Sequence, residues 1–244
     1  MAARRILSIG GGGFMMEGRF APIDHELLWL MGKDRPRVCV IPTPADDAQE
    51  VLDRFYRAFD PFCDVHQLTP SRKPTERSVP LSDITLSLSA FDGIFVTGEN
   101  TKSELGAWRE WGIDSALRAA YQAGVLLCGA SAGAIFWYEA AFTGSCNDDY
   151  AVLPGLGLLP GGCCPHHEDG SPRAERLKLA VAQGEMPSTV AIPDNAAVLY
   201  EDGTPIACYS WASGASVRRL ELREGRMTSE SLGVPEIRLR EVSS

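Results

Sequence analysis

Ser131 lies at the centre of the residue pattern in this chain that most clearly suggests chemistry. An apolar run, Val125–Cys128, leads into the motif Gly129-Ala130-Ser131-Ala132-Gly133, and a helix-compatible segment follows. A strand that turns sharply into a helix at Gly-x-Ser-x-Gly strains the central residue and lifts its side chain clear of the sheet. The motif predicts a nucleophile elbow with Ser131 as the nucleophile. The alternative is a small-residue turn that serves packing alone.

A serine hydroxyl needs a general base within hydrogen-bond reach, and the base needs an acceptor that fixes its tautomer. His25 falls in a helical run and His66 in an apolar strand, where structural or solvent-facing roles are expected. His166 and His167 follow a stretch rich in Gly and Pro that is expected to form a loop, so one of them is the expected base. His166 directly follows Pro165, whose fixed φ restricts the direction of the chain.

Several motifs together resemble a known family. They are Val96-Thr97-Gly98-Glu99-Asn100-Thr101, the elbow, Leu159-Pro160-Gly161 and Cys164-Pro165-His166. Their order is that of peptidase E, and from about Ile6 to Tyr200 the chain resembles peptidase family S51. The resemblance implies a fold similar to class I glutamine amidotransferases, with serine in place of cysteine at the elbow. It also implies a peptidase similar to the aspartyl dipeptidases or, more distantly, the cyanophycinases.

The resemblance implies a catalytic triad in which Ser131 is the nucleophile and His166 the base. The third member in the family is usually a Glu in a turn after a strand, and Asp194 in Ile192-Pro193-Asp194-Asn195 occupies the matching position. Asp194 is one methylene shorter than the family's residue, so another carboxylate could orient the base instead. The competing carboxylates are Asp148, Asp149, Glu168 and Asp169.

Acyl transfer also requires backbone donors aimed at the developing oxyanion, and the candidates are Gly98 and Ala132. In the family, the turn that contains Gly98 is usually Gly-Gly-Asn, whereas here Glu99 precedes Asn100, and both are expected to contact substrate. The Glu99 carboxylate could repel an acidic substrate or hold a free α-amino group. The resemblance also matches Arg173 to an arginine that binds an acidic residue, a role for which a guanidinium fork is suited. A solvent-facing helix position explains Arg173 equally well.

The elements that would position these residues follow an alternating pattern. Short apolar segments typical of buried parallel strands alternate with segments that have helical spacing of apolar residues. We predict an α/β fold with a doubly wound, mostly parallel sheet, helices on both faces and a β-rich C-terminal part, forming one domain over 1–244. The expected strands are Arg5–Ile9, Arg37–Ile41, Val65–Leu68, Gly93–Thr97 and Val125–Cys128, and the expected helices are Pro22–Met31, Asp47–Phe59 and Ile113–Ala123.

Beyond the elbow the expected pattern changes. Thr143–Gly162 is rich in Gly, Asn, Asp and Pro and is expected to form loops and short hairpins. A helix is expected over Arg173–Gln183. Four further strands are expected, over Thr189–Ile192, Ala197–Tyr200, Pro205–Ser210 and Val217–Leu222.

Composition narrows the classes of partner. The 244 residues, 45% of them hydrophobic, suffice for a large core, and the net charge of -9 opposes binding to nucleic acid. Gly10–Gly13 ends the first apolar run well below the length of a signal peptide or membrane span, so we expect a cytoplasmic protein with no membrane partner. A dinucleotide-binding fingerprint would need glycine at position 15, which is Met15.

The seven cysteines are not expected to form disulfides in a chain without an export signal. The segment Cys163–Asp169 has residue types that bind zinc, but no second ligand pair at finger-like spacing exists, so neither a metal nor another cofactor is expected.

We therefore expect a serine exopeptidase, monomeric or homodimeric, that acts on short peptides and is a dipeptidase favouring N-terminal Asp. The alternatives are a cyanophycinase-like or otherwise specific peptidase of the same family, and a non-catalytic amidotransferase-like binding domain. A general α/β-hydrolase esterase is disfavoured because no histidine follows His167.

Overall fold

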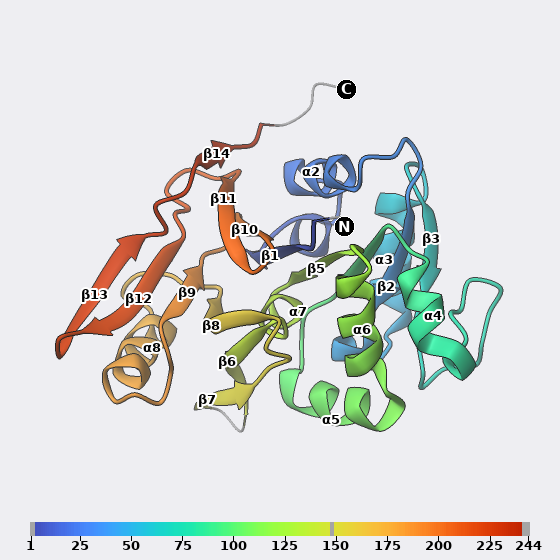
Figure 1. Ribbon diagram of the computed structural model, residues 1–244. Helices are drawn as coiled ribbons and strands as arrows, with labels where there is room; N and C mark the ends of the chain where they lie inside the picture. The colour runs from blue at the N-terminus through green and yellow to red at the C-terminus, as the bar shows by residue number, and fades with distance from the viewer. Residues whose placement is uncertain (1–2, 147–148, 241–244) are drawn as a thin grey trace.

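The computed structural model describes residues 3–146 and 149–240, and within them the strands form one sheet of eight and one of six. In the larger sheet, the order β3-β2-β4-β5-β1 is parallel throughout (Figure 1). β10 pairs antiparallel with β1, β11 pairs antiparallel with β10, and β14 pairs parallel with β11. The strands of this sheet are β1 (Arg5–Gly11), β2 (Arg37–Ile41), β3 (Asp64–Gln67), β4 (Gly93–Val96), β5 (Leu126–Ala130), β10 (Ala196–Glu201), β11 (Thr204–Ser210) and β14 (Glu236–Arg238).

Helices cover both faces of the larger sheet, as the alternating pattern predicts. Successive strand residues point to opposite faces, so β1, β2, β4 and β5 each contribute to two hydrophobic clusters. One cluster includes α2 (Pro22–Met31) and α3 (Gln49–Phe59), whose Phe55 and Phe59 stack at 4.4 Å. The other includes apolar residues of α4 (Ile84–Ser89), α5 (Thr101–Trp111) and α6 (Ile113–Gln122). The predicted α/β class and mostly parallel sheet are therefore confirmed.

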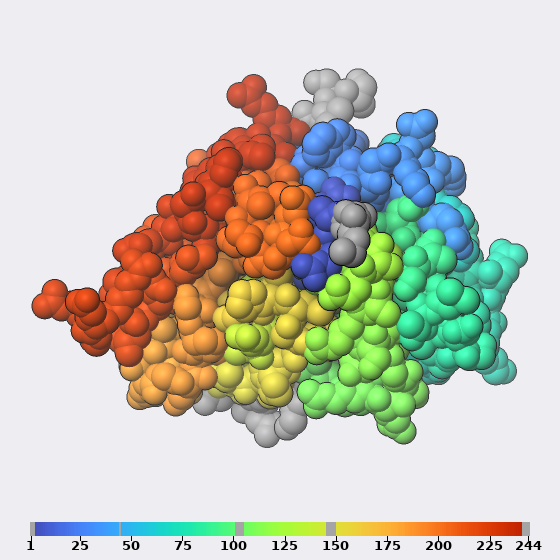
Figure 2. All heavy atoms as spheres, viewed as in Figure 1, coloured from blue at the N-terminus to red at the C-terminus, as the bar shows by residue number. Residues whose placement is uncertain are grey.

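The six-stranded sheet combines expected and unexpected strands. β9 and β12 match expected strands, whereas β7 and parts of β6 and β8 lie in Thr143–Gly162, where loops and short hairpins were expected. Its order is β13-β12-β9-β8-β6-β7, with β6, β8 and β9 parallel, and α8 packs against it. In the space-filling view, β12 and β13 form the left edge of the molecule (Figure 2). The bounds are β6 (Tyr138–Cys146), β7 (Asp149–Pro154), β8 (Leu159–Pro165), α8 (Pro172–Ala182), β9 (Thr189–Ile192), β12 (Arg218–Arg223) and β13 (Arg226–Ser231).

The expectation of a loop directly before His166 was wrong. The Gly- and Pro-rich stretch is the first half of β8, which pairs with β6 on one side and β9 on the other. β8 forms a strand because both of its faces are buried. Cys163 lies in the cluster that the two sheets share, and its neighbour Cys164 lies in the cluster that includes residues of α8. The imidazole is therefore held at the end of a buried strand rather than on a loop.

The two sheets share one hydrophobic cluster. Ile6 and Val198 of the larger sheet belong to the same cluster as Cys163 and Ile192 of the smaller one. At this junction, the buried Tyr138 hydroxyl of β6 donates a hydrogen bond of 3.0 Å to the Tyr200 hydroxyl of β10. None of the helices in the described part of the chain is long and apolar enough to cross a bilayer.

Asp24 is a buried carboxylate that holds the chain between β1 and α2. Its Oδ2 accepts hydrogen bonds from the backbone N–H groups of Phe14 at 2.9 Å and Ala21 at 2.8 Å. Phe14 begins the short helix α1 (Phe14–Glu17) and packs edge-on against Phe55 and Phe59. Burial raises the pKa of Asp24 to about 7, against the two hydrogen bonds, which lower it.

This raised pKa predicts that stability falls as the pH rises. Between about pH 4 and 7, the unfolded carboxyl is ionised while the folded one keeps its proton, so folding binds more protons and the free energy of unfolding decreases with pH. Asp24→Asn stays neutral and keeps an acceptor oxygen. In urea unfolding curves measured across this pH range, we expect its free energy of unfolding to lack the decrease caused by Asp24, which in the wild type is at most about 4 kcal/mol in total. Asp24→Ala should instead lose about 1–3 kcal/mol at every pH, because it leaves buried N–H groups without an acceptor. Equal pH slopes for the wild type and Asp24→Asn would contradict the assignment.

Candidate active site

Ser131 occupies the sharp turn between β5 and the one-turn helix α7 (Ala132–Ile135). Its backbone has φ 58° and ψ −121°, a conformation that L residues rarely adopt. Its N–H donates to the Ile9 carbonyl of β1 at 3.0 Å, so the neighbouring strand fixes the turn. The predicted strand, strained serine and helix are therefore all present, although the helix is shorter than the sequence suggests.

The two motif glycines allow the backbone segments of the elbow to touch. A Cβ at Gly129 would lie within 3.0 Å of backbone atoms of Gly133 and Ala134. A Cβ at Gly133 would lie 2.7 Å from the Thr97 carbonyl oxygen at the end of β4. Larger residues at either position would push the turn out of the sheet, which is the physical reason for the Gly-x-Ser-x-Gly spacing.

His166 reaches Ser131 from the smaller sheet. It directly follows β8, and its Nε2 lies 2.7 Å from Ser131 Oγ. Its φ of 52° is in the left-handed region, so the chain turns sharply there and presents the ring to the elbow. His167, the other sequence candidate, is buried, and its Nε2 finds no hydrogen-bond partner among the described residues. Burial lowers the pKa of His167.

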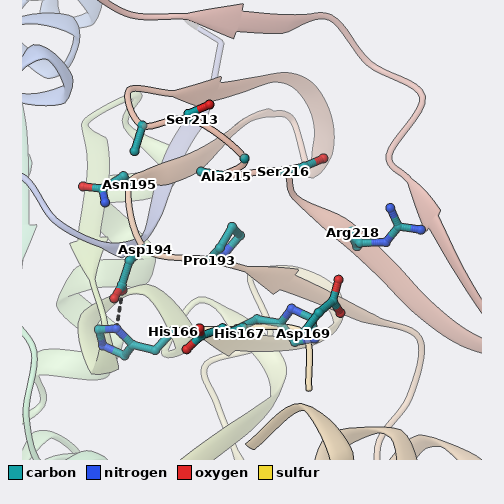
Figure 3. Close-up of a pocket in the computed structure, with 13 residues that line it drawn as sticks. His166, His167, Asp169, Pro193, Asp194, Asn195, Ser213, Ala215, Ser216 and Arg218 are labelled. Atoms are coloured by element: carbon teal, nitrogen blue, oxygen red, sulfur yellow. Dashed lines mark hydrogen bonds and ion pairs between the residues drawn. The ribbon is translucent and has the colours of Figure 1, made fainter. Parts of the chain in front are cut away.

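Asp194 completes the hydrogen-bonded chain on the far side of the imidazole. Its Oδ1 lies 2.5 Å from His166 Nδ1, as the dashed line in Figure 3 marks. The pair forms because Pro165 and Ile192 are register partners in parallel β8 and β9, so the residues that follow them emerge at the same sheet edge. The hydrogen bond from His166 holds the pKa of Asp194 below its ordinary value, against the effect of burial.

A cavity of about 730 Å³ lies behind this pair (Figure 3). The Asp194 side chain is 43% exposed, so solvent reaches the carboxylate from this side. Glu168 and Asp169 line the same cavity, but the carboxylate hydrogen-bonded to Nδ1 is that of Asp194. Of the other competing carboxylates, Asp148 and the side chain of Asp149 lie outside the described residues.

Gly11 at the end of β1 is a site residue that sequence reasoning missed. A Cβ there would overlap Asp194 Oδ1 and lie 2.7 Å from His166 Cε1. A Cβ at Gly10, its neighbour, would lie 2.8 Å from the Ile192 carbonyl carbon. The run Gly10–Gly13 was interpreted only as a possible nucleotide cradle. Two of its glycines instead allow close approach between β1 and the turn that carries Asp194.

The two candidate oxyanion donors lie next to the nucleophile. Ala132 is the first residue of α7, where backbone N–H groups have no acceptor within the helix. Gly98 follows β4, and a Cβ on it would lie 2.8 Å from Ser131 Cβ and 3.2 Å from Ser131 Oγ. Glu99 has φ 129°, a conformation that favours glycine and costs a side chain about 1–3 kcal/mol. Strained backbone is therefore present at Ser131, His166 and Glu99.

Asn100 and Arg173, the other two residues predicted to contact substrate, lie in different parts of the fold. Asn100 is exposed immediately before α5. The Arg173 guanidinium lies over the Tyr150 ring, 5.1 Å from its centroid, and also contacts the Cys164 thiol. Among the described residues, Arg173 is not one of those that line the cavity beside Ser131. Its predicted role in substrate recognition stays a prediction.

A second cavity, of about 360 Å³, is lined by Ser131 and gives a small ligand access to this side chain. Apolar groups of Met15, Met16 and Val51 form part of its lining. Gly11, Gly12, Gly98, Ala130 and His166 also line it, together with the charged residues Glu50, Arg54 and Glu99. Because α3 carries several of these residues, sequence motifs alone gave no sign of them.

The cysteines near the site do not offer a second nucleophile. Burial raises the pKa of Cys164 to about 12 and that of Cys163 well above its ordinary value, so both remain thiols. Among the described residues, no group of three or more His, Cys, Asp or Glu side chains is arranged to hold a metal ion.

Three known proteins that this chain resembles in sequence or in structure are named as peptidases. A protein of Bacillus subtilis (strain 168) named uncharacterized peptidase YgaJ is 33% identical over 231 residues, covering 95% of this chain and 98% of that protein. A provisionally assigned peptidase E from Listeria monocytogenes EGD-e superposes with a TM-score of 0.64 at 19% identity, over 86% of this chain and 100% of its own. A peptidase from an acI-B1 actinobacterium superposes with a TM-score of 0.65 at 13% identity, over 95% of both chains.

The two solved structures share this fold, which is consistent with the class I glutamine amidotransferase-like architecture that the resemblance implies. The family model of peptidase family S51 matches residues 6–207, nearly the range over which the motifs show the resemblance. With the elbow, the histidine and the match in place, the chain belongs to peptidase family S51.

Proposed function

We propose that this peptidase is a serine exopeptidase that hydrolyses short peptides with Ser131, His166 and Asp194 as a catalytic triad. The observation that carries the proposal is the continuous chain of contacts, 2.7 Å from Ser131 Oγ to His166 Nε2 and 2.5 Å from His166 Nδ1 to Asp194 Oδ1. Both pairs of atoms are close enough for a hydrogen bond, and the order of groups is the one that serine activation requires.

In the proposed mechanism, His166 Nε2 removes the Ser131 proton as Oγ attacks the scissile carbonyl carbon. Asp194 accepts the Nδ1 hydrogen bond and stabilises the imidazolium that forms. The N–H groups of Gly98 and Ala132 hold the oxyanion. His166 then gives its proton to the leaving amine, which departs and leaves an ester on Ser131. Water, deprotonated by the same imidazole, hydrolyses the ester and restores the hydroxyl.

The proposed substrate is a dipeptide with N-terminal Asp, with Arg173 as the group that binds the acidic side chain. A specific observation favours a second candidate within the family, a peptidase that does not prefer acidic residues. Glu50 and Glu99 place two carboxylates in the cavity beside Ser131. Rates on Asp-Leu, Leu-Leu and β-Asp-Arg separate the aspartyl dipeptidase, the neutral peptidase and the cyanophycinase-like enzyme.

A fluorophosphonate probe tests whether the serine is activated at all. We expect the wild type to be labelled at Ser131, located by peptide mass mapping, and the label to disappear in Ser131→Ala. Failure to label the folded wild-type protein would favour the non-catalytic amidotransferase-like domain, because an unactivated serine reacts slowly.

Gly11→Ala tests the alignment of the imidazole with its carboxylate. The added methyl group would overlap Asp194 Oδ1, so the pair must move apart. We expect kcat to fall by about 10²-fold, because a shift of about 1 Å in a catalytic group has an effect of this size. Gly106→Ala in α5 is the matched control, since a Cβ there meets nothing within 4 Å. Unchanged turnover in Gly11→Ala would mean that the contact does not position His166.

A further inference from the structure

The cavity beside Ser131 carries charges of both signs on separate elements. Glu99 comes from the turn after β4, while Arg54 and Glu50 come from α3. A cavity of about 360 Å³ lies near the lower end of the usual range for ligand sites and suits a peptide of a few residues. A short peptide with free ends also carries both charges, an ammonium at one end and a carboxylate at the other.

Glu99 is placed to meet the ammonium end. It is covalently next to Gly98, whose backbone lies against the Cβ and Oγ of Ser131. In a peptide, the α-ammonium nitrogen is only two bonds from the carbonyl carbon of its own residue. A carboxylate beside an oxyanion donor therefore suits the N-terminal residue, whose carbonyl would then face Ser131. The strain at φ 129° would be relieved by glycine, which points to a role for this side chain.

Arg54 is placed to meet the carboxylate end. One of its Nη atoms lies 3.4 Å from the Met15 carbonyl oxygen, and the other lies 3.6 Å from Glu50 Oε1. Both contacts are long, and the side chains of Arg54 and Glu50 are 45% and 77% exposed. An exposed helical pair of this kind contributes little to stability, so a substrate carboxylate can take the place of Glu50 on the guanidinium.

We propose that Glu99 and Arg54 together recognise the two charges of a short zwitterionic peptide, and that this recognition restricts the enzyme to exopeptidase cleavage after the N-terminal residue. The inference rests on the proposed function and adds the substrate class: peptides with a free α-amino group and a carboxylate. The carboxylate assigned to Arg54 is the C-terminus of the peptide, and an acidic side chain remains assigned to Arg173.

Binding to Ser131→Ala protein, measured by titration calorimetry, tests the proposal without turnover. The ligands are Leu-Leu, N-acetyl-Leu-Leu, Leu-Leu-amide and Asp-Leu-amide. We expect N-acetylation to weaken binding about tenfold, and the isosteric Glu99→Gln to abolish this difference. We expect amidation of Leu-Leu to weaken binding about tenfold, and Arg54→Gln to abolish that difference. If Asp-Leu-amide binds tighter than Leu-Leu-amide only while Arg54 is present, Arg54 binds an acidic side chain, and its assignment to the C-terminal carboxylate is wrong.

Arg57→Gln is the matched control, because Arg57 is an exposed arginine of the same helix α3 and is not among the described residues that line this cavity. It should leave both differences unchanged. Equal binding of free and acetylated peptide, loss of discrimination in Arg57→Gln rather than Arg54→Gln, or no binding at millimolar peptide would each overturn the proposal. A wild-type protein that binds these peptides with the expected discrimination but does not hydrolyse them would refute the proposed function alone.

In protein that retains Ser131, kinetic measurements should show whether Glu99 affects KM or kcat. Glu99→Gln should raise KM for Leu-Leu about tenfold and leave the slow hydrolysis of N-acetyl-Leu-Leu unchanged. A uniform fall in kcat on both substrates would indicate that Glu99 supports the geometry of Gly98 instead of binding the amine.

Discussion

Ser131→Ala protein is expected to lose peptide hydrolysis by about 10⁴- to 10⁶-fold. The substitution removes the hydroxyl that His166 contacts at 2.7 Å and leaves the oxyanion donors in place, so only a small residual rate over water remains. Alanine retains the Cβ, and with it the steric demands of the turn. Urea unfolding curves should therefore match those of the wild type while kcat/KM collapses.

Ser213→Ala provides a matched control, because this exposed serine lines the cavity behind Asp194 rather than the one beside the nucleophile. Its turnover should equal that of the wild type. Near-normal hydrolysis by Ser131→Ala would remove Ser131 from the mechanism, whatever the geometry of the elbow.

Asp194→Asn is expected to lower kcat by about 10³- to 10⁴-fold with little change in KM. The carboxylate can only accept a hydrogen bond from His166, so it keeps the proton on Nδ1 and leaves Nε2 able to accept the Ser131 proton. An amide can donate to Nδ1 and so favour the opposite tautomer, which directs an N–H at Oγ. The amide also cannot stabilise the imidazolium.

Two further variants separate the possible reasons for that loss. Asp194→Glu keeps the charge but adds a methylene to a contact that is already 2.5 Å, so an intermediate rate is expected. Glu168→Gln should behave as the wild type, because Glu168 lines the neighbouring cavity without bonding to Nδ1. If Glu168→Gln is the slower enzyme, the carboxylate that orients the base has been misidentified.

The elbow was predictable because its cause is local. The steric demands of a strand-to-helix turn act on five consecutive residues, Gly129–Gly133, and their spacing is visible in the sequence. The parallel strands were predictable for a similar reason, since burial on both faces leaves unbroken apolar runs. Their bounds agree with the observed β1, β2, β3, β4 and β5 to within two residues.

The partner of each C-terminal strand was not predictable. Apolar alternation reports that a strand is buried but not which strand it pairs with, and β9 and β10 are adjacent in sequence yet belong to different sheets. Asp194 stands between them, and an Asp before Asn has no local feature that separates it from an ordinary turn residue. Only the family resemblance pointed to Asp194, and in the structure its carboxylate is hydrogen-bonded to the His166 imidazole.

Arg54 and Gly11 were missed for the same physical reason. Each reaches the site through tertiary packing, from α3 and from the end of β1, with no motif around it. A charged residue on an amphipathic helix is usually solvent-facing, so its sequence environment gives no reason to prefer a substrate contact.

The hydroxyl and the imidazole belong to different layers of the molecule, since Ser131 follows β5 and His166 follows β8. In the proposed mechanism, the proton crosses the junction between the two sheets, which apolar side chains, including Ile6 and Ile192, and the Tyr138–Tyr200 hydrogen bond hold together. Substitutions along this junction, distant from the site, are therefore expected to change the separation of Ser131 Oγ and His166 Nε2 without touching either residue.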